Sequence, residues 1–174
     1  MANIAPTTTA NGRQYRRISS SFTRPSDITQ YAVGDLVANS VTAASVTPLS
    51  WATTGSRPFF IPRIRLQKTK SDVTSAQFRI HLYTASPAVT TTGDNAAYGT
   101  DVAGNATWLG SFDGTMVAKH NDGTVVDCLP TQALRRLDYI GDPGTLYGLI
   151  EALATYTPAS AEVFTATLVM EFDQ

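Results

Sequence analysis

Alternation of apolar and polar side chains is the clearest pattern in this sequence. It is most regular over residues 59–70 and 76–84, where the two kinds of side chain follow each other with a period of two. This period is typical of a β-strand with one buried and one hydrated face. The positions expected to face inward are Phe60, Ile64, Leu66, Phe78, Ile80 and Leu82, and those expected to face outward are Arg63, Arg65, Gln67, Gln77, Arg79 and His81.

Turn-forming residues separate further segments of strand character. Strand pattern begins at Tyr15 and continues over residues 28–37, where it surrounds a turn signal at Gly34-Asp35. The later predicted strands span residues 107–112, 115–119, 124–129, 135–140, 146–154 and 162–172. Asp113-Gly114 and Asn121-Asp122-Gly123 supply the positive φ of tight hairpins, so we expect a meander around them. The nearly continuous apolar segment 146–154 fits a fully buried strand or a short helix, and its length and position favour the strand.

Two segments stand apart from the strands. Residues 85–106, rich in Ala, Thr, Gly, Asn and Asp, exceed the usual loop length, which indicates either a functional excursion or a segment that a partner orders. Residues 1–12 are small and polar, as in a flexible N-terminal arm or a frayed terminus. Residues 13–174 are then one domain. The predicted fold class is all-β, a single-domain β-sandwich of about eight to ten strands with a jelly-roll-like topology.

Composition agrees with a packed domain that has an unusually uncharged surface. Hydrophobic residues make up 43% of the 174 residues and charged residues only 16%, against roughly 25% charged in an average protein. The surface is therefore mostly Thr, Ser, Ala and Asn, as in virion and adhesin-like β-domains. No apolar run approaches the roughly 18 residues of a membrane span, and the N-terminus lacks the pattern of a secretory signal, so we expect synthesis in the cytoplasm.

Charge is divided unevenly along the chain. Residues 1–85 hold ten Lys/Arg against three acids (+7), and residues 86–174 hold three against eleven (−8). This division indicates pairing with another subunit or a charged partner, unless the two halves interleave in space. The candidate partner-binding residues are Arg13, Arg16, Arg17, Arg63 and Arg65. The sequence pI of about 6.1 argues against nucleic acid and favours an acidic protein surface.

The sequence shows no catalytic or metal-binding motif, so we predict no enzymatic activity and no cofactor. It has two histidines and no Gly-x-Ser-x-Gly elbow. The single cysteine, Cys128, excludes an internal disulfide and is interpreted as a structural thiol. Two weaker alternatives remain: oxygen ligands for Ca²⁺ and a sugar-binding platform. Their candidate residues are Asp94, Asn95 and Asp101 for calcium, and Trp51 and Trp108 for sugar.

The tryptophans are also explained as core or interface residues, with Trp108 expected on the same side of its strand as Phe112. This second explanation is favoured over a sugar platform because Trp108 lies in a predicted strand together with Phe112.

Two runs of the sequence resemble small proteins encoded near the major capsid gene of tailed bacteriophages, a group taken to include head decoration (cement) proteins. They are IPRIRLQKTKSDVTSAQFRIHLYTASPAVTTTGDNAAY, residues 61–98, and LYGLIEALATYTPASAEVFTATLVMEF, residues 146–172. The resemblance implies a β-sandwich on the outside of the virion that binds the major capsid protein, often as a trimer, without contact to a membrane. The alternative function is a glycan-binding, tail-tip or adhesin-like module of the virion.

Overall fold

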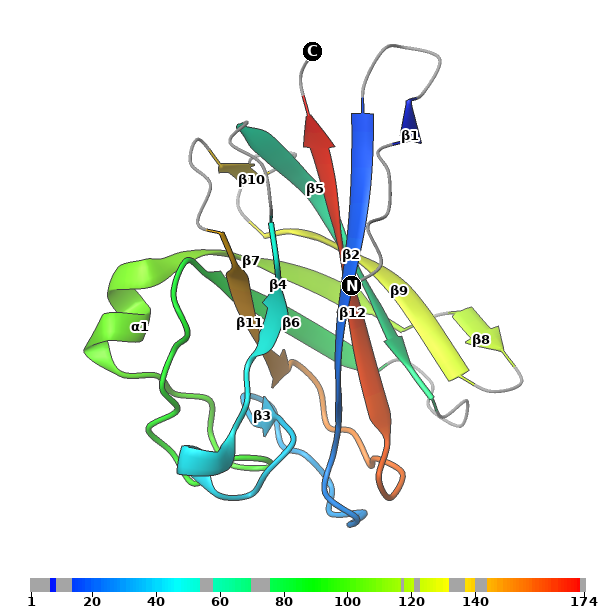
Figure 1. Cartoon of the computed structure of the whole chain (residues 1–174). Coiled ribbons are helices and arrows are strands. Elements are labelled where there is room, and N and C mark those ends of the chain that lie inside the picture. The colour runs from blue at the N-terminus through cyan, green and yellow to red at the C-terminus, as the bar shows by residue number, and fades with distance from the viewer. Residues whose placement is uncertain are drawn as a thin grey trace.

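The computed structural model in Figure 1 describes residues 7–8, 14–53, 58–69, 76–116, 118–120, 123–131, 137–139 and 144–172. Within these ranges strands dominate. The elements are β1 (Thr7–Thr8), β2 (Gln14–Thr23), β3 (Leu36–Val37), a 3-10 turn (Ala43–Ser45), β4 (Leu49–Trp51), β5 (Phe59–Lys68), β6 (Gln77–Tyr83), α1 (Val102–Thr107), β7 (Trp108–Thr115), β8 (Ala118–His120), β9 (Gly123–Pro130), β10 (Leu137–Tyr139), β11 (Leu146–Ala152) and β12 (Val163–Phe172). In the same ranges, no helix is long and apolar enough to cross a membrane.

Four antiparallel strand pairs organise the fold. They are β2 with β12, β4 with β11, β5 with β9, and β6 with β7. These eight strands form one long antiparallel ribbon that turns back between β6 and β7. Figure 1 shows the two strands at the open end of the ribbon, blue β2 and red β12, side by side. The ribbon is rolled because β12 also pairs with β5, and β11 also pairs with β6.

Rolling the ribbon produces two sheets, β2-β12-β5-β9 and β4-β11-β6-β7. This is the strand order of an eight-stranded jelly roll, so the predicted fold class is confirmed. The end of β9 also pairs with β7 and joins the two sheets at one side. The described chain has twelve strands, more than predicted, because β1, β3, β8 and β10 add pieces of two or three residues.

The core fills the space between the sheets. Phe78, Ile80 and Leu82 of β6 point into it and are fully buried, as the alternation predicted. Across the core, the ring of Phe78 meets the ring of Phe164 edge to face, with 5.5 Å between centroids. The strong alternation of 76–84 therefore reports a strand whose one face is covered by the opposite sheet.

The prediction that Phe60 of β5 faces the core is wrong. Ile64 and Leu66 are buried as expected, but Phe59 and Ile61, not Phe60, share their face at the start of the strand. The cause is a β-bulge: Arg63 lies opposite Val169 and Phe60 lies opposite Glu171, so β5 carries one extra residue there. Pro62 lies in this bulge, where a residue without an N–H is tolerated.

The predicted turn at Asp113-Gly114 is wrong. β7 runs without interruption through both residues, and Asp113 pairs across the sheet with Arg79. Gly114 is needed for close packing, since a Cβ there would lie 2.7 Å from the Sγ of Cys128. The second expected reversal agrees with the pairing of His120 and Gly123 between β8 and β9, although residues 121–122 lie outside the described ranges.

The segment 28–37 is mostly not a strand, contrary to prediction. Only Leu36–Val37 forms one, and Tyr31 makes an isolated bridge to Tyr156. Residues 85–106 include most of helix α1, which the sequence did not indicate. They fold back on the domain itself, because the amide of Leu36 donates to the carbonyl of Ala96 at 2.8 Å. Short-range patterning misses both segments because tertiary contacts fix their backbones.

The N-terminal segment is described only at Thr7–Thr8, which pair antiparallel with Gln14 and Tyr15 of β2. The rest of residues 1–12 lies outside the described ranges, so the arm stays a prediction. The segments predicted over 135–140, 146–154 and 162–172 appear as strands β10, β11 and β12.

Candidate functional site

The outer surface of the β2-β12-β5-β9 sheet brings together three of the predicted arginines. The register of the strands sets two adjacent rows, which are Arg17, Val169 and Arg63, and then Ser19, Thr167, Arg65 and Asp127. All these side chains stand on the face opposite the core, where Ser and Thr supply most of the neighbours. We call the set Arg17, Arg63, Arg65 and Asp127 the arginine face.

Asp127 lies at the centre of the charges on this face. Arg65 donates to both of its carboxylate oxygens, from Nε at 2.9 Å and from Nη2 at 3.3 Å. The Nε of Arg63 is 3.6 Å from the same carboxylate, beyond good hydrogen-bond distance. Hydrogen bonding from Arg65, and the positive charges of Arg65, Arg63 and Arg17, hold the pKa of Asp127 below its usual value, and partial burial opposes this shift.

The arginine face carries an excess of positive charge, because its three guanidinium groups lie around one carboxylate, Asp127. The second carboxylate on this side of the sheet, Glu171, is nearly buried. The side chains of Arg65 and Arg63 remain 51% and 38% exposed. Val169, between Arg17 and Arg63 in the register, is only 3% exposed although it lies outside the core cluster. The aliphatic stems of long cationic side chains cover apolar surface in this way. Exposed guanidinium groups on a stiff sheet are suited to binding carboxylates.

The remaining predicted arginines do not join this face. Arg16 precedes Arg17 in the same strand, so its side chain points to the opposite side, the side of Ile18. Arg13 lies outside the described residues. Asp127 was missed as part of the site, because its position beside Arg65 depends on the pairing of β5 with β9.

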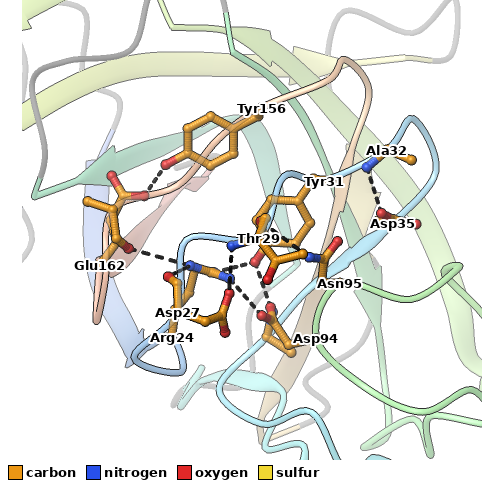
Figure 2. Close-up of polar contacts among 12 residues, drawn as sticks. Arg24, Asp27, Thr29, Tyr31, Ala32, Asp35, Asp94, Asn95, Tyr156 and Glu162 are labelled. Atoms are coloured by element: carbon orange, nitrogen blue, oxygen red, sulfur yellow. Dashed lines mark hydrogen bonds and ion pairs between the residues drawn. The ribbon is translucent and has the colours of Figure 1, made fainter.

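A buried polar network lies at one end of the jelly roll (Figure 2). The carboxylate of Asp94 accepts from Nη2 of Arg24 at 2.8 Å, from the hydroxyl of Tyr31 at 2.7 Å and from the amide of Ala38 at 2.7 Å. The side chains of Arg24 and Asp94 have no exposed area. Burial raises the pKa of Asp94, and its three hydrogen bonds offset part of that shift. The network ties the loop 85–106 to the end of β2.

The calcium candidates are therefore held apart in separate contacts. Asp94 is bound by Arg24, and the side-chain Nδ2 of Asn95 donates to the carbonyl of Thr29. Asp101 caps helix α1 by accepting from the amide of Gly104 at 2.7 Å. Among the residues that the structure describes, no three His, Cys, Asp or Glu side chains are grouped as a metal ion would require.

A second buried ion pair lies near this network. The Nζ of Lys68 is 2.6 Å from Oε1 of Glu162, with neither side chain exposed, and the hydroxyl of Tyr156 donates to Oε2 of the same carboxylate. Tyr156 stacks in parallel on Tyr31, so its ring links the two sets of charges. These charged and hydroxyl groups bond to each other and are inaccessible to solvent, which indicates a structural role.

His81 lies on the outer face of the other sheet, where Tyr98 of the loop 85–106 covers it. Its Nε2 is 2.9 Å from Glu151, and the ring of Tyr98 stacks on it with 4.3 Å between centroids. The side chain of His81 is consequently only 13% exposed. Beside it, Arg79 makes two 2.8 Å hydrogen bonds to Asp113. The predicted outward direction of His81 is right, but the loop 85–106 covers it.

The two tryptophans do not form a shared platform. Trp51 is fully buried and donates from Nε1 to the carbonyl of Ala166 at 2.9 Å. Trp108 is 41% exposed, whereas Phe112 is buried, so the expectation that both lie on one side is wrong. The alternation changes at a bulge between them, because Leu82 lies opposite Gly110 while Tyr83 lies opposite Trp108.

No family model and no curated protein matches the chain. Solved structures with some similarity include a chain from turnip yellow mosaic virus, at 12% identity over 99% of this chain and 87% of that chain, with a TM-score of 0.29. A chain from maize chlorotic mottle virus has 10% identity over 91% and 93%, with a TM-score of 0.27. One from black queen cell virus has 16% identity over 92% and 69%, with a TM-score of 0.28. Similarity at this level carries no argument, and the jelly-roll assignment rests on the strand pairing.

Proposed function

We propose that this chain is a structural protein of a virion, which decorates the outside of a capsid and strengthens the contacts between capsid subunits. The arginine face is the observation that carries the proposal. It is an exposed, stiff surface with more guanidinium groups than carboxylates, and it lies on a sheet rich in Ser and Thr. Such a surface fits an acidic area on a protein partner.

Two further features support a virion role. Jelly rolls are recurrent in viral capsid domains, although lectins and cupins use them too. The resemblance of residues 61–98 and 146–172 to proteins encoded beside tailed-phage capsid genes adds the external position and the major capsid protein as partner. The trimeric state comes from that resemblance alone. The alternative of a glycan-binding module loses one of its two aromatic residues, because Trp51 lies in the core.

Binding to expanded empty capsids of the cognate phage tests the proposal. The chain should co-sediment with capsids, and binding should weaken as salt is raised. The double variant Arg63→Ala/Arg65→Ala should raise the dissociation constant at least tenfold, about 1.4 kcal/mol. Asp127→Asn removes the one negative charge of the arginine face, so it should tighten binding, an effect opposite to that of simple structural damage.

Arg79→Ala is the matched control, because it removes an arginine from the outer face of the other sheet. It should leave capsid binding unchanged. Absence of binding to capsids, or equal losses from the control and the double variant, would refute the proposal. Binding to cell-surface glycans instead of capsids would favour the adhesin-like alternative.

A further inference from the structure

Within the residues that the structure describes, one long side of strand β2 has no partner strand. On one side it pairs with β12 at ten consecutive positions, from Thr23 opposite Val163 to Gln14 opposite Phe172. On its other side, β1 pairs only with Gln14 and Tyr15. In the described parts of the chain no strand pairs with β2 on this side after Tyr15. An open edge of this length is a template for another strand.

Hydrogen-bond direction identifies which main-chain groups face this open side. The amide of Arg24 donates to the carbonyl of Glu162, which is directly opposite in the continued register of β2 and β12. The direction of main-chain hydrogen bonds alternates along an antiparallel strand. The N–H and C=O groups of even-numbered residues of β2 therefore bond to β12, and those of odd-numbered residues point to the open side. The outward residues are Arg17, Ser19, Ser21 and Thr23. Within the described chain, no main-chain hydrogen bond satisfies their N–H and C=O groups on that side.

Strand β4, the nearest element, leaves these groups open. Its hydrogen bond to β2 runs from the amide of Ser50 to the side-chain Oγ of Ser20, at 2.9 Å. Ser20 is even-numbered, and its side chain points to the inner face together with Ile18 and Phe22. Among the described residues, the main chain on the open side of β2 is therefore left without a partner strand.

The open edge is complementary to a second copy of itself. In an antiparallel pair centred on Ser20, Ser19 lies opposite Ser21 of the second copy, and Arg17 lies opposite Thr23. On the inner face Ile18 lies opposite Phe22, two apolar side chains that are half-buried at the rim of the core in the single chain. Apolar and Ser/Thr cross-strand pairs both stabilise sheets. The two Arg17 residues are about 20 Å apart along the strands, so they do not repel appreciably.

The ends of the open stretch match this register. At one end β1 occupies the outer side of Tyr15. Because Thr7 of β1 already lies opposite Tyr15 on this side, the pairing centred on Ser20 must end at Arg17 and at Thr23, the last residue of β2. Two residues beyond Thr23, Pro25 of the second copy has no N–H to donate. The register therefore uses all four outward residues of each chain and ends where neither chain has a free group to offer.

We propose that β2 pairs with β2 of a second copy across a two-fold axis at Ser20, which makes a homodimer with one continuous sheet. A closed two-fold interface uses the same surface of both chains, so neither copy of β2 keeps an open side for a third chain. The dimer carries two arginine faces on one extended sheet. This inference is independent of the proposed capsid role, because it follows from strand pairing, and it replaces the trimer that the resemblance implies.

Light scattering tests the dimer, since it measures the mean mass of the protein at each concentration. Samples from about 1 µM to about 1 mM cover dissociation constants within that range. The mass should rise with concentration from 18.6 kDa to twice that value and stop there. Ser19→Pro should prevent the rise at all concentrations, because its ring projects into the open side while no internal amide bond is lost. Ser19→Thr keeps the amide and the hydroxyl, so it should dimerise as the parent chain does.

Amide hydrogen exchange in the unsubstituted chain gives a measurement that does not depend on a variant folding. The amides of Arg17, Ser19, Ser21 and Thr23 should exchange at least tenfold more slowly at a concentration where the dimer dominates than where the monomer dominates. A monomer at every concentration, a trimer, or a dimer that folded Ser19→Pro still forms would overturn the proposal. A monomer whose capsid binding is lost on Ser19→Pro would also overturn it and assign the edge to a capsid strand.

Discussion

Replacing Asp94 by alanine should destabilise the folded chain by about 3–5 kcal/mol, the usual cost of breaking a buried ion pair. The carboxylate has no exposed area and accepts hydrogen bonds from Arg24, Tyr31 and the amide of Ala38. Its removal leaves the buried guanidinium of Arg24 with the longer 3.4 Å contact to the partly exposed Asp27 in place of the 2.8 Å contact to Asp94, and leaves two further donors without an acceptor. Each of those losses carries a desolvation cost that water cannot relieve inside the domain.

Thermal and urea unfolding followed by circular dichroism would measure this cost. For a chain of 174 residues, a loss of about 3–5 kcal/mol lowers the melting temperature by about 6–20 °C. The matched control is Asp127→Ala, which breaks an ion pair whose arginine is 51% exposed and should cost about 0.2–1 kcal/mol. Equal costs for the two variants would refute the reasoning. The double variant Arg24→Met/Asp94→Leu should recover part of the loss, because neither charge is then left buried alone.

Three further predictions concern single groups. Arg65 and its neighbours lower the pKa of Asp127 below its unfolded value of about 3.9. Its contribution to stability is therefore present above that pH and is lost as pH falls through the folded pKa. Urea titrations should show Asp127→Asn costing less than about 1 kcal/mol at pH 7, and the cost should shrink as pH falls below about 3.9. Burial raises the pKa of Cys128 to about 12, so a disulfide reagent at pH 8 should label it only as fast as the chain unfolds, and labelling at the rate of a free thiol would contradict this. Gly114→Ala should cost about 1–3 kcal/mol in thermal unfolding through overlap with Cys128, and less in a Cys128→Ala background; an unchanged cost there would exclude that contact as the cause.

The long strands were predictable because their alternation is local and strong. In β6 each inward residue of the pattern is buried, and β12 was placed within one residue of its ends. Where a bulge changes the period, the alternation predicted the wrong face of the strand, as at Phe60 in β5 and between Trp108 and Phe112 in β7. A bulge adds one residue to one strand only, so it becomes visible only when the partner strand is known.

The candidate site was likewise only partly predictable from the sequence. Alternation alone placed Arg63 and Arg65 on the hydrated face of one strand. It could not place Arg17 beside them, because β12, from the far end of the chain, lies between β2 and β5. Nor could it show that Asp127 neutralises part of the charge, or that Asp94 lies buried against Arg24 and not in a hydrated loop.

The sequence by itself determined the all-β class, the position of most long strands and the sign of the charge along one strand. These properties depend on residues within a few positions of each other, which share a strand and alternate between its faces. The tertiary structure decided the jelly-roll pairing, the buried ion pairs, the cover over His81 and the open side of β2. Each of these depends on contacts between residues far apart in the chain, and the order in which strands pair cannot be read from any one of them.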